Sequence, residues 1–293
     1  MNTETIKQWG GFLRRLRDFF ESRGFLEVTT PVMVEAGAFE SVIDTIKVEG
    51  GGELQSSPEL AMKRFVSETL GPIYQICPSF RDDPISKIHR KEFTMLEFYQ
   101  PSATYKHCIN TMKELLQSLS STPLQFREFS VRKLFLSQAG IELTEDREKF
   151  AVAARELGCS ISDSDEWNDI FFKIMIDVIE PKLNPEFPTI VRNYPASLSA
   201  LSRLSDDGQT ADKFEIYWKG MEICNGCSEL TDPEMLKERW KAENESRLRS
   251  GKSPHPEPRT FFASAEEGFI PSAGVAVGLN RLFACYYGEP FFL

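Results

Sequence analysis

The stretch FRDDPISKIHRKEFTMLEFY, residues 80–99, decides the fold class of this chain of 293 residues. Three residues typical of turns stand near its start and predict a hairpin turn: Asp82, Asp83 and Pro84. Side chains that suit a nucleotide stand around this turn: Arg81, His89, Arg90 and Phe93. An arginine presents a planar fork of donors to a phosphate or a carboxylate, and a phenylalanine offers a face for adenine. The stretch therefore indicates a nucleotide site.

A second segment supplies another arginine behind a run of small residues. In AGVAVGLNRL, residues 273–282, the small residues are Ala273, Gly274, Ala276 and Gly278. Small side chains let the backbone approach a ligand closely. Arg281 follows them, so we expect it to reach the outer phosphates of the same nucleotide.

Four segments, in order along the chain, resemble motifs of the class II aminoacyl-tRNA synthetases, in particular the lysyl branch. Residues 80–99 resemble motif 2 of that class, and residues 273–282 resemble motif 3. FLEVTTPVM, residues 25–33, is similar to motif 1, and FEIYWKGMEICNGCSEL, residues 214–230, to an acidic strand segment of the lysyl enzymes. The resemblance implies an α+β fold, in which an antiparallel sheet flanked by helices forms one class II synthetase-like catalytic domain over residues 1–293.

The same resemblance implies roles for individual residues. Those implied to contact ATP are Arg81, Asp83, His89, Arg90, Phe93, Glu222, Ile223, Gly278 and Arg281. The two that it implies to be catalytic are Arg81 and Arg281. Mg²⁺ would be held by Glu215 and Glu222, since hard cations prefer carboxylate oxygen. The residues implied to bind the amino acid are Ser57, Glu59, Glu97, Tyr99, Asn225 and Glu229.

The acids of that amino-acid pocket also indicate its substrate through their charge. Glu59, Glu97 and Glu229 suit a molecule that carries two ammonium groups. A neutral amino acid would leave buried acids unpaired, at a cost of several kcal/mol. Such a site would reject it by a factor on the order of 10⁴. We therefore expect lysine or one of its isomers as the substrate.

Two features differ from the lysyl-tRNA synthetases and resemble a shorter branch of the class. The first expected helix begins almost at Met1, which leaves no room for their N-terminal anticodon-binding barrel. The net charge of −10 also differs from the basic faces of proteins that grip RNA. Ala276 stands where the synthetases have a motif 3 glycine. This pattern is similar to the elongation factor P lysyltransferases, which activate (R)-β-lysine and transfer it to a lysine of elongation factor P.

That resemblance implies partners and leaves alternatives open. The expected partners are elongation factor P, (R)-β-lysine or lysine, and a second copy of the chain bound through motif 1, without stable tRNA binding. One alternative is a stand-alone lysine-activating ligase that loads another carrier or a tRNA. The other is a catalytically silent paralogue with a binding or regulatory role, which the retained arginines and acids disfavour. The sequence does not fix the choice between α-lysine and β-lysine, the acceptor, or the base that deprotonates the acceptor amine.

Three positions depart from the motif patterns of the family. Asp83 is one methylene shorter than the usual glutamate, and Arg90 stands where asparagine is common. Asn280 replaces the aspartate that usually precedes the motif 3 arginine. These changes affect the expected contacts to ATP and the orientation of Arg281.

The composition is typical of a cytoplasmic enzyme. Its 41% hydrophobic and 27% charged residues are ordinary for a globular protein. No apolar run approaches the roughly 18 residues that a membrane span needs, so no membrane association is expected. Six cysteines without a framework of paired spacings suit reduced thiols. Cys224 and Cys227 form a CxxC, for which packing is favoured over a zinc or redox site because a second pair is lacking.

Apolar spacing predicts several helices. The opening segment has apolar residues at three-and-four spacing, at Trp9, Phe12, Leu13, Leu16, Phe19 and Phe20. Further helices are expected at residues 106–120 and 233–251. Residues from about 125 to 188 alternate helical stretches and end in a run of prolines, so we interpret them as a helical insertion on the catalytic domain.

Overall fold

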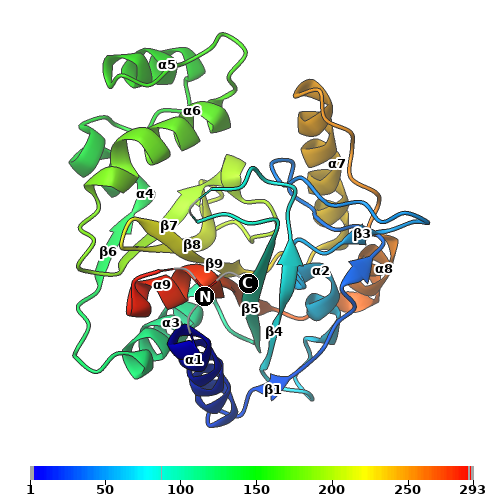
Figure 1. The fold of residues 1–293 in the computed structure, drawn as a ribbon. Coiled ribbons are helices and arrows are strands. Elements are labelled where there is room, and N and C mark those ends of the chain that lie inside the picture. Colours follow the sequence, from blue (N-terminus) through cyan, green and yellow to red (C-terminus); the bar gives the residue numbers. More distant parts are fainter. Residues whose placement is uncertain (1–2, 87, 290, 292–293) are drawn as a thin grey trace.

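The computed structural model describes residues 3–86, 88–289 and 291, and it is organised around one large sheet (Figure 1). The eight strands lie in the order β1-β4-β5-β10-β9-β8-β7-β6. In that order they are Leu26–Glu27, Ile73–Phe80, Glu92–Pro101, Ser272–Gly278, Met221–Ser228, Thr210–Trp218, Thr189–Pro195 and Arg127–Ser130. The strands from β4 to β7 pair antiparallel, whereas β1 and β6 are parallel to their neighbours. The expected antiparallel sheet is therefore confirmed at its centre and becomes mixed at both edges.

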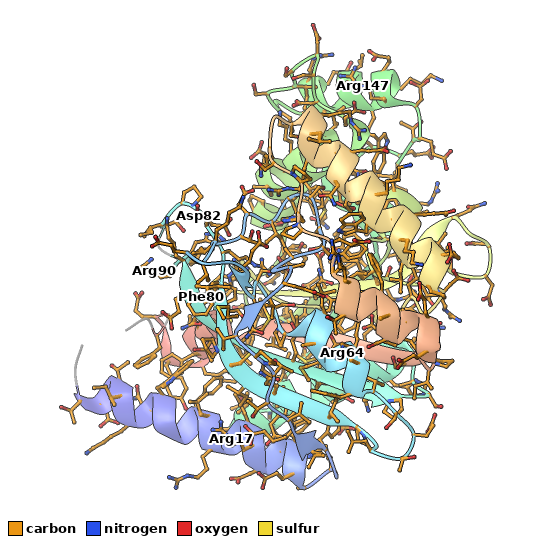
Figure 2. All side chains as sticks on the ribbon, turned by 90° about the vertical axis from the view of Figure 1, so that its right-hand side faces the viewer. Arg17, Arg64, Phe80, Asp82, Arg90 and Arg147 are labelled. Atoms are coloured by element: carbon orange, nitrogen blue, oxygen red, sulfur yellow. The ribbon has the colours of Figure 1, made fainter. Side chains whose placement is uncertain are left out.

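β4 and β5 form the hairpin expected from the sequence, but a long loop joins them. The register ends with Phe80 opposite Glu92, so residues 81–91 lie outside both strands. Figure 2 labels Phe80 at the end of β4 and Asp82 in the loop beyond it. The backbone N–H of Asp82 donates to the carbonyl of Asp44 at 2.8 Å. The turn expected at Asp82, Asp83 and Pro84 is therefore wrong: the loop folds back only at Lys91, whose carbonyl accepts from the N–H of Arg81 at 2.9 Å.

Alternation along the strands places the polar residues on one face of the sheet. Successive side chains of a strand point to opposite faces. In β5, Glu97 and Tyr99 line a pocket, whereas Leu96 and Phe98 join the apolar core on the other face. Strands β9 and β10 follow the same rule with Asn225, Cys227, Gly274, Ala276 and Gly278, and Glu229, directly after β9, lines the same pocket as Cys227.

A β-bulge in β9 returns Glu222 to this polar face. Along β8 the pairing steps from Cys224 to Glu222, which leaves Ile223 as an extra residue. In a regular strand, Glu222 would lie three residues from Asn225 and point to the opposite face. The bulge therefore places both side chains on the same side of the sheet.

Three helices cover the apolar face of the sheet: α1 (Thr3–Glu21), α3 (Tyr105–Leu119) and α9 (Leu279–Tyr287). The apolar stripe of α1 buries Phe12, Leu16, Phe19 and Phe20, as its spacing predicts. The ring of Phe20 stacks on that of Tyr74 in β4 with 4.9 Å between centroids. The expected helices at the start of the chain and at residues 106–120 are confirmed.

The polar face is bordered on one side by α2 (Glu59–Met62), α7 (Pro233–Arg249), α8 (Arg259–Gly268) and the short pair β2 (Met33–Val34) and β3 (Glu53–Leu54). Asp232 caps α7 by accepting from the N–H of Met235 at 2.8 Å. Gly251, with φ +73°, follows the end of this helix, in agreement with the expected stop. None of the helices in the described residues is long and apolar enough to cross a membrane.

The helical segment that follows β6 lies at the other end of the sheet, away from α7 and α8 (Figure 1). Its elements are α4 (Val131–Leu134), a π-helical turn (Phe135–Ala139), α5 (Arg147–Glu156), α6 (Trp167–Ile174), a second π-helical turn (Met175–Ile179) and a 3₁₀ turn (Glu180–Lys182). They pack around a separate apolar core, in which Phe135 stacks on Phe171 with 5.0 Å between centroids. Residues 127–130 belong to the main sheet, so the expected start near 125 was too early. Their role as an insertion into one catalytic domain stays a prediction.

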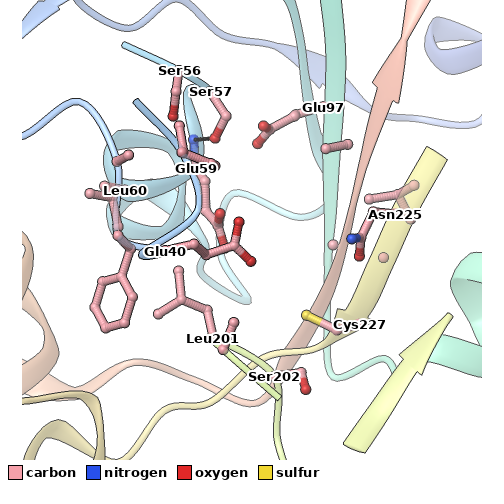
Figure 3. Close-up of a pocket in the computed structure, with 18 of the residues that line it drawn as sticks. Glu40, Ser56, Ser57, Glu59, Leu60, Glu97, Leu201, Ser202, Asn225 and Cys227 are labelled. Carbon is pink, nitrogen blue, oxygen red and sulfur yellow. Dashed lines mark hydrogen bonds between the residues drawn. The ribbon is translucent and has the colours of Figure 1, made fainter. Parts of the chain in front are cut away.

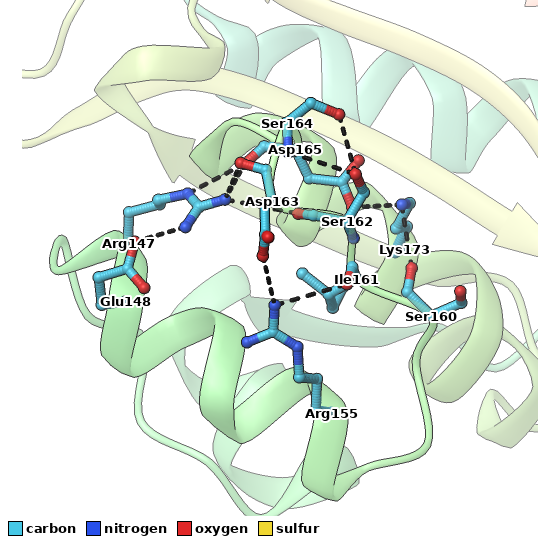
Figure 4. Close-up of polar contacts among 10 residues, drawn as sticks. All are labelled: Arg147, Glu148, Arg155, Ser160, Ile161, Ser162, Asp163, Ser164, Asp165 and Lys173. Atoms are coloured by element: carbon cyan, nitrogen blue, oxygen red, sulfur yellow. Dashed lines mark hydrogen bonds and ion pairs between the residues drawn. The ribbon is translucent and has the colours of Figure 1, made fainter.

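The loop between α5 and α6, residues 157–166, is rich in polar contacts (Figure 4). The guanidinium of Arg147 donates to the carbonyls of Asp163 at 2.9 Å and Asp165 at 2.8 Å. Lys173 forms an ion pair with the carboxylate of Asp165. The loop between α5 and α6 is thus tied to both helices, and Phe172 of α6 reaches a pocket on the polar face.

Candidate active site

Two adjoining pockets lie on the polar face. The first, of about 120 Å³, we call the carboxylate pocket, and among its lining are Ser57, Glu59, Glu97, Tyr99, Asn225 and Glu229. The second, of about 380 Å³, we call the arginine pocket, and among its lining are Arg81, Asp83, His89, Arg90, Phe93, Glu215, Glu222, Ile223, Gly278 and Arg281. All site residues expected from the sequence therefore line one of these two pockets, and Arg81 and Asn225 line both.

Six residues line both pockets and form what we call the junction: Glu40, Ile43, Arg81, Lys213, Asn225 and Ala276. A molecule that fills one pocket can meet a molecule in the other only at this place. Arg81 and Lys213 bring two cationic groups to the junction, and Glu40 brings a carboxylate. The junction is thus equipped to join an anionic group from each side.

A buried lysine separates two acids of the carboxylate pocket. Lys63 Nζ lies 2.6 Å from Glu59 Oε1 and 2.6 Å from Glu229 Oε2, and its side chain is 3% exposed. Burial acts to lower the pKa of Lys63, but the carboxylates of Glu229 and Glu59 outweigh it and raise that pKa. Lys63 therefore stays charged, and it gives Glu59 and Glu229 a partner within the protein that the sequence does not predict.

Glu97 is the acid in this pocket with an unused oxygen (Figure 3). Tyr99 OH donates to its Oε2 at 3.0 Å, while the buried Oε1 has no hydrogen-bond partner among the described residues. Burial, and then the charge of Glu59, raises the pKa of Glu97 to about 8. A buried acceptor left without a donor is costly, so the group suits an incoming ammonium.

Gly274 makes the space in which these side chains lie. A Cβ at this position would stand 2.3 Å from Tyr99 Cε1 and 2.8 Å from Glu229 Oε1. Both distances are shorter than van der Waals contact, so the strand needs glycine here. The sequence predicts that Gly274 lets the backbone approach a ligand closely. In the structure, its missing side chain leaves room for the ring of Tyr99.

Arg81 projects into the arginine pocket with an unpaired donor. Its Nε is buried and has no hydrogen-bond partner in the described part of the chain. Its guanidinium carbon lies 5.5 Å from the ring centre of Phe93. A buried N–H of this kind suits an anionic oxygen, and the neighbouring aromatic face suits a base or ribose.

The second arginine is held by a neutral histidine. Arg281 Nη2 lies 2.7 Å from His89 Nε2. Because an arginine can only donate, His89 Nε2 accepts, and its proton sits on Nδ1, 2.9 Å from Ser86 Oγ. Burial, and then the charge of Arg281, lowers the pKa of His89, which favours this neutral form. Arg281 Nη1 also donates to the carbonyl of Glu222 at 3.0 Å, so the guanidinium is oriented from two sides.

Comparison with known proteins identifies the family of this chain. The family model described as tRNA synthetases class II (D, K and N) matches residues 2–290. The chain belongs to this family. A relative from Photobacterium profundum, named "Elongation factor P--(R)-beta-lysine ligase", is 34% identical over 290 residues, which cover 94% of this chain and 90% of the relative. Relatives with the same name come from Vibrio cholerae serotype O1, at 34% identity with 97% and 91% of the two chains covered, and from Edwardsiella ictaluri, at 33% with 92% and 87% covered.

Membership of the class II synthetase family implies the use of ATP, and the acids of the arginine pocket fit a divalent cation beside it. Burial, and then the charge of Glu215, raises the pKa of Glu222 to about 7. A cation between these two acids would relieve their repulsion. The described residues contain no group of three or more His, Cys, Asp or Glu side chains that could hold a metal. A cation here would therefore share oxygen ligands from the nucleotide, as Mg²⁺ commonly does.

The two acids differ in their freedom to bind a cation. Glu215 already accepts from four donors: Tyr194 at 2.5 Å, Tyr217 at 2.6 Å, Lys213 at 3.1 Å and Asn225 at 3.3 Å. Glu222 meets the guanidinium of Arg281 at 4.0 Å. Of the two acids, Glu222 would thus be the better placed ligand for a cation, and Glu215 would contribute its charge.

Four residues that line these pockets or pair with their acids were not predicted from the sequence: Glu40, Lys63, Phe172 and Lys213. Lys63 carried a signal, because it follows Glu59 by four residues and so shares its helix face. Phe172 and Glu40 gave none, since they come from a remote helix and an irregular loop.

The CxxC pair does not act together in this strand. Cys224 and Cys227 are three residues apart in β9, which directs their side chains to opposite faces. Burial raises the pKa of both thiols, so neither favours the thiolate that metal binding requires. The packing interpretation fits this geometry.

The raised pKa of Glu97 predicts how the stability of the ligand-free protein depends on pH. Folded Glu97 keeps a proton that the unfolded chain has released, so stability falls as the pH rises toward the folded pKa of about 8. Between about pH 7 and about pH 8.5 we expect a loss on the order of 1 kcal/mol. Thermal unfolding at both pH values measures it. Glu97→Gln should flatten this limb, the exposed control Glu92→Gln should keep it, and an unchanged slope in Glu97→Gln would contradict the assignment.

Proposed function

We propose that this protein activates (R)-β-lysine, or lysine, with ATP as an aminoacyl-adenylate and transfers the acyl group to a lysine side chain of elongation factor P. The junction carries this proposal, because it connects a pocket built for ammonium groups with a pocket built for phosphates. The acceptor comes from the names of the relatives, which align over nearly the whole chain.

The first step follows from the placement of the two arginines. The substrate carboxylate would approach the α-phosphate at the junction, where Arg81 can neutralise the charge that develops. Arg281, held by His89 and the Glu222 carbonyl, would bind the outer phosphates. Phe93 would support adenine. The carboxylate oxygen attacks phosphorus, the bond to the bridging oxygen breaks, and pyrophosphate leaves.

The carboxylate pocket supports a diammonium substrate by its charge. Away from the junction, the pocket holds the three acids Glu59, Glu97 and Glu229 and the one ammonium of Lys63, so two negative charges remain there when all are ionised. A substrate with two ammonium groups balances them. Ala276 adds a methyl group at the junction, next to the reacting carboxylate, which favours an isomer with a displaced amino group.

Mg²⁺ would bind beside Glu222, with Glu215 as the second acid. It would supply charge neutralisation for the phosphates.

The expected homodimer, location and absence of stable tRNA binding are also proposals. A homodimer through motif 1 is supported by two exposed apolar side chains of that motif, Leu26 in the edge strand β1 at 47% and Met33 in β2 at 59% exposure. A cytoplasmic location suits a translation factor as acceptor, and the net charge of −10 disfavours stable tRNA binding.

ATP–pyrophosphate exchange tests this function. We expect exchange that depends on (R)-β-lysine and is at least tenfold slower with α-lysine, (S)-β-lysine or norleucine, because only the first fits both the charge and the junction. Norleucine is the matched neutral control. A preference for α-lysine would favour the ligase for another carrier, and no exchange with any of them would favour the silent paralogue.

A further inference from the structure

One carboxylate at the junction has no task in the activation step. Glu40 lies in the irregular segment of residues 35–52, between β2 and β3. Of the six junction residues it is the one with a carboxylate, and Figure 3 shows it projecting into the pocket near Glu59. Val42, two residues later, is 68% exposed and lines the arginine pocket. Glu40 therefore belongs to the junction and lies two residues from Val42 at the solvent-exposed rim of the arginine pocket.

The backbone around Glu40 is fixed by α7 and the segment after it. Arg247 donates to the carbonyls of Ser41 at 2.9 Å and Ile43 at 2.8 Å. Glu243 accepts from the N–H of Ser41 at 2.6 Å, and the ring of His255 lies 3.0 Å from the Glu40 carbonyl. The backbone is thus held at Glu40 and at the residues that follow it, Ser41 and Ile43.

The charges that face Glu40 come from four different parts of the fold. Lys213 of β8 and Arg81 act to lower the pKa of Glu40, whereas Glu59 of α2 and Glu243 of α7 act to raise it. Burial is the largest influence, and the net result is a raised pKa. A carboxylate whose pKa moves toward neutrality is a better proton acceptor at physiological pH.

The other acids of the site are committed elsewhere. Glu59 and Glu229 pair with Lys63, and Glu215 accepts from four donors. Glu97 lines only the carboxylate pocket, whereas Asp83 and Glu222 line only the arginine pocket. Among the acids of the two pockets, Glu40 is thus the one that lines the junction, where the acceptor amine would meet the acyl carbon.

We propose that Glu40 is the general base of the transfer step, an assignment that rests on the proposed function. The acceptor lysine enters as an ammonium and gives one proton to the Glu40 carboxylate. The nitrogen lone pair then forms the bond to the acyl carbon, and the bond from that carbon to the phosphate oxygen breaks, so AMP leaves with the electron pair. The second nitrogen proton passes to water, Glu40 releases its proton, and an amide remains.

Glu40→Gln tests this role, because it keeps the size of the side chain and removes the base. We expect pyrophosphate exchange within about threefold of wild type, and transfer to elongation factor P from the same organism slowed by about 10² in single turnover. Hydroxylamine attacks acyl-adenylates as the neutral amine at neutral pH and needs no base. Formation of the hydroxamate should therefore proceed at the wild-type rate in the variant.

Three results separate the possibilities. If Glu40→Gln slows the reactions with hydroxylamine and with elongation factor P equally, Glu40 has a structural role and is not the base. If the variant raises the KM for the amino acid in exchange, Glu40 binds the substrate and is not the base. Absence of exchange in wild type would instead overturn the proposed function. Glu49→Gln, an exposed acid of the same loop, serves as the matched control. Glu40→Asp is the second variant, should Glu40→Gln fail to fold, and it should retain transfer within about tenfold, since the carboxylate is shifted by one methylene.

Discussion

Replacement of Arg81 by lysine should slow ATP–pyrophosphate exchange by about 10³-fold, the largest catalytic effect that we expect in this site. Arg81 lines both pockets, and its buried Nε has no partner in the described residues. A lysine keeps the positive charge but loses the planar fork that can bond two oxygens at once. The lost donor acts where charge develops in the transition state, so kcat should fall more than KM rises.

Arg64→Lys is the matched control for this experiment. Arg64 is exposed, bonds to Ser264 Oγ at 3.2 Å and lines neither pocket. Its exchange rate should stay near that of wild type. If Arg81→Lys keeps more than a tenth of the wild-type kcat, charge alone suffices at the junction, and the guanidinium fork does not have the role that we assign to it.

The parts of the site that could be predicted are those whose chemistry is visible in consecutive residues. Glu97 and Tyr99 are two apart in a strand, so they share a face, and the hydrogen bond between them follows from that spacing. Arg81 and Phe93 flank one hairpin, so the strand pairing brings them together. Local order was enough to place both pairs.

Glu222 shows where local order misleads. Its approach to the arginine pocket depends on Ile223 being extra in the strand, and nothing in the residue types MEICNG announces a bulge. The family resemblance assigned Glu222 correctly to the pocket, whereas regular alternation would have placed it with the apolar core. Register depends on pairing with both neighbouring strands, which no single segment contains.

Asn280 raised a doubt about Arg281 that the geometry removes. The side-chain oxygen of Asn280 accepts from the N–H of Thr94 at 2.8 Å, so it joins α9 to β5. Arg281 is oriented by other groups, His89 and the Glu222 carbonyl. The substitution therefore acts on the joint between helix and sheet and leaves the guanidinium in place.

Lys63→Met should cause the largest loss of stability, because it removes the cation that lies between two acids of the carboxylate pocket. Glu229 is 5% exposed at its side chain, so its charge has little access to water. Removing one partner of a buried ion pair typically costs about 3–5 kcal/mol, since the other charge stays uncompensated. The loss should be greater near pH 8 than near pH 6, because the pKa of Glu229 is already raised to about 7 and its protonation at lower pH relieves the repulsion. Chemical unfolding at both pH values measures this.

Lys237→Met provides the comparison, because it removes the same group from an exposed ion pair with Glu266. Exposed ion pairs of this kind contribute little to the free energy of unfolding, so the unfolding midpoint of Lys237→Met should stay close to that of wild type. Glu229→Gln added to Lys63→Met should recover part of the lost stability by removing the uncompensated acid. If Lys63→Met alone unfolds at the wild-type midpoint at both pH values, the carboxylates are neutral in the ligand-free protein. The carboxylate pocket would then attract its diammonium substrate only as those acids lose their protons on binding, and binding would release protons in proportion.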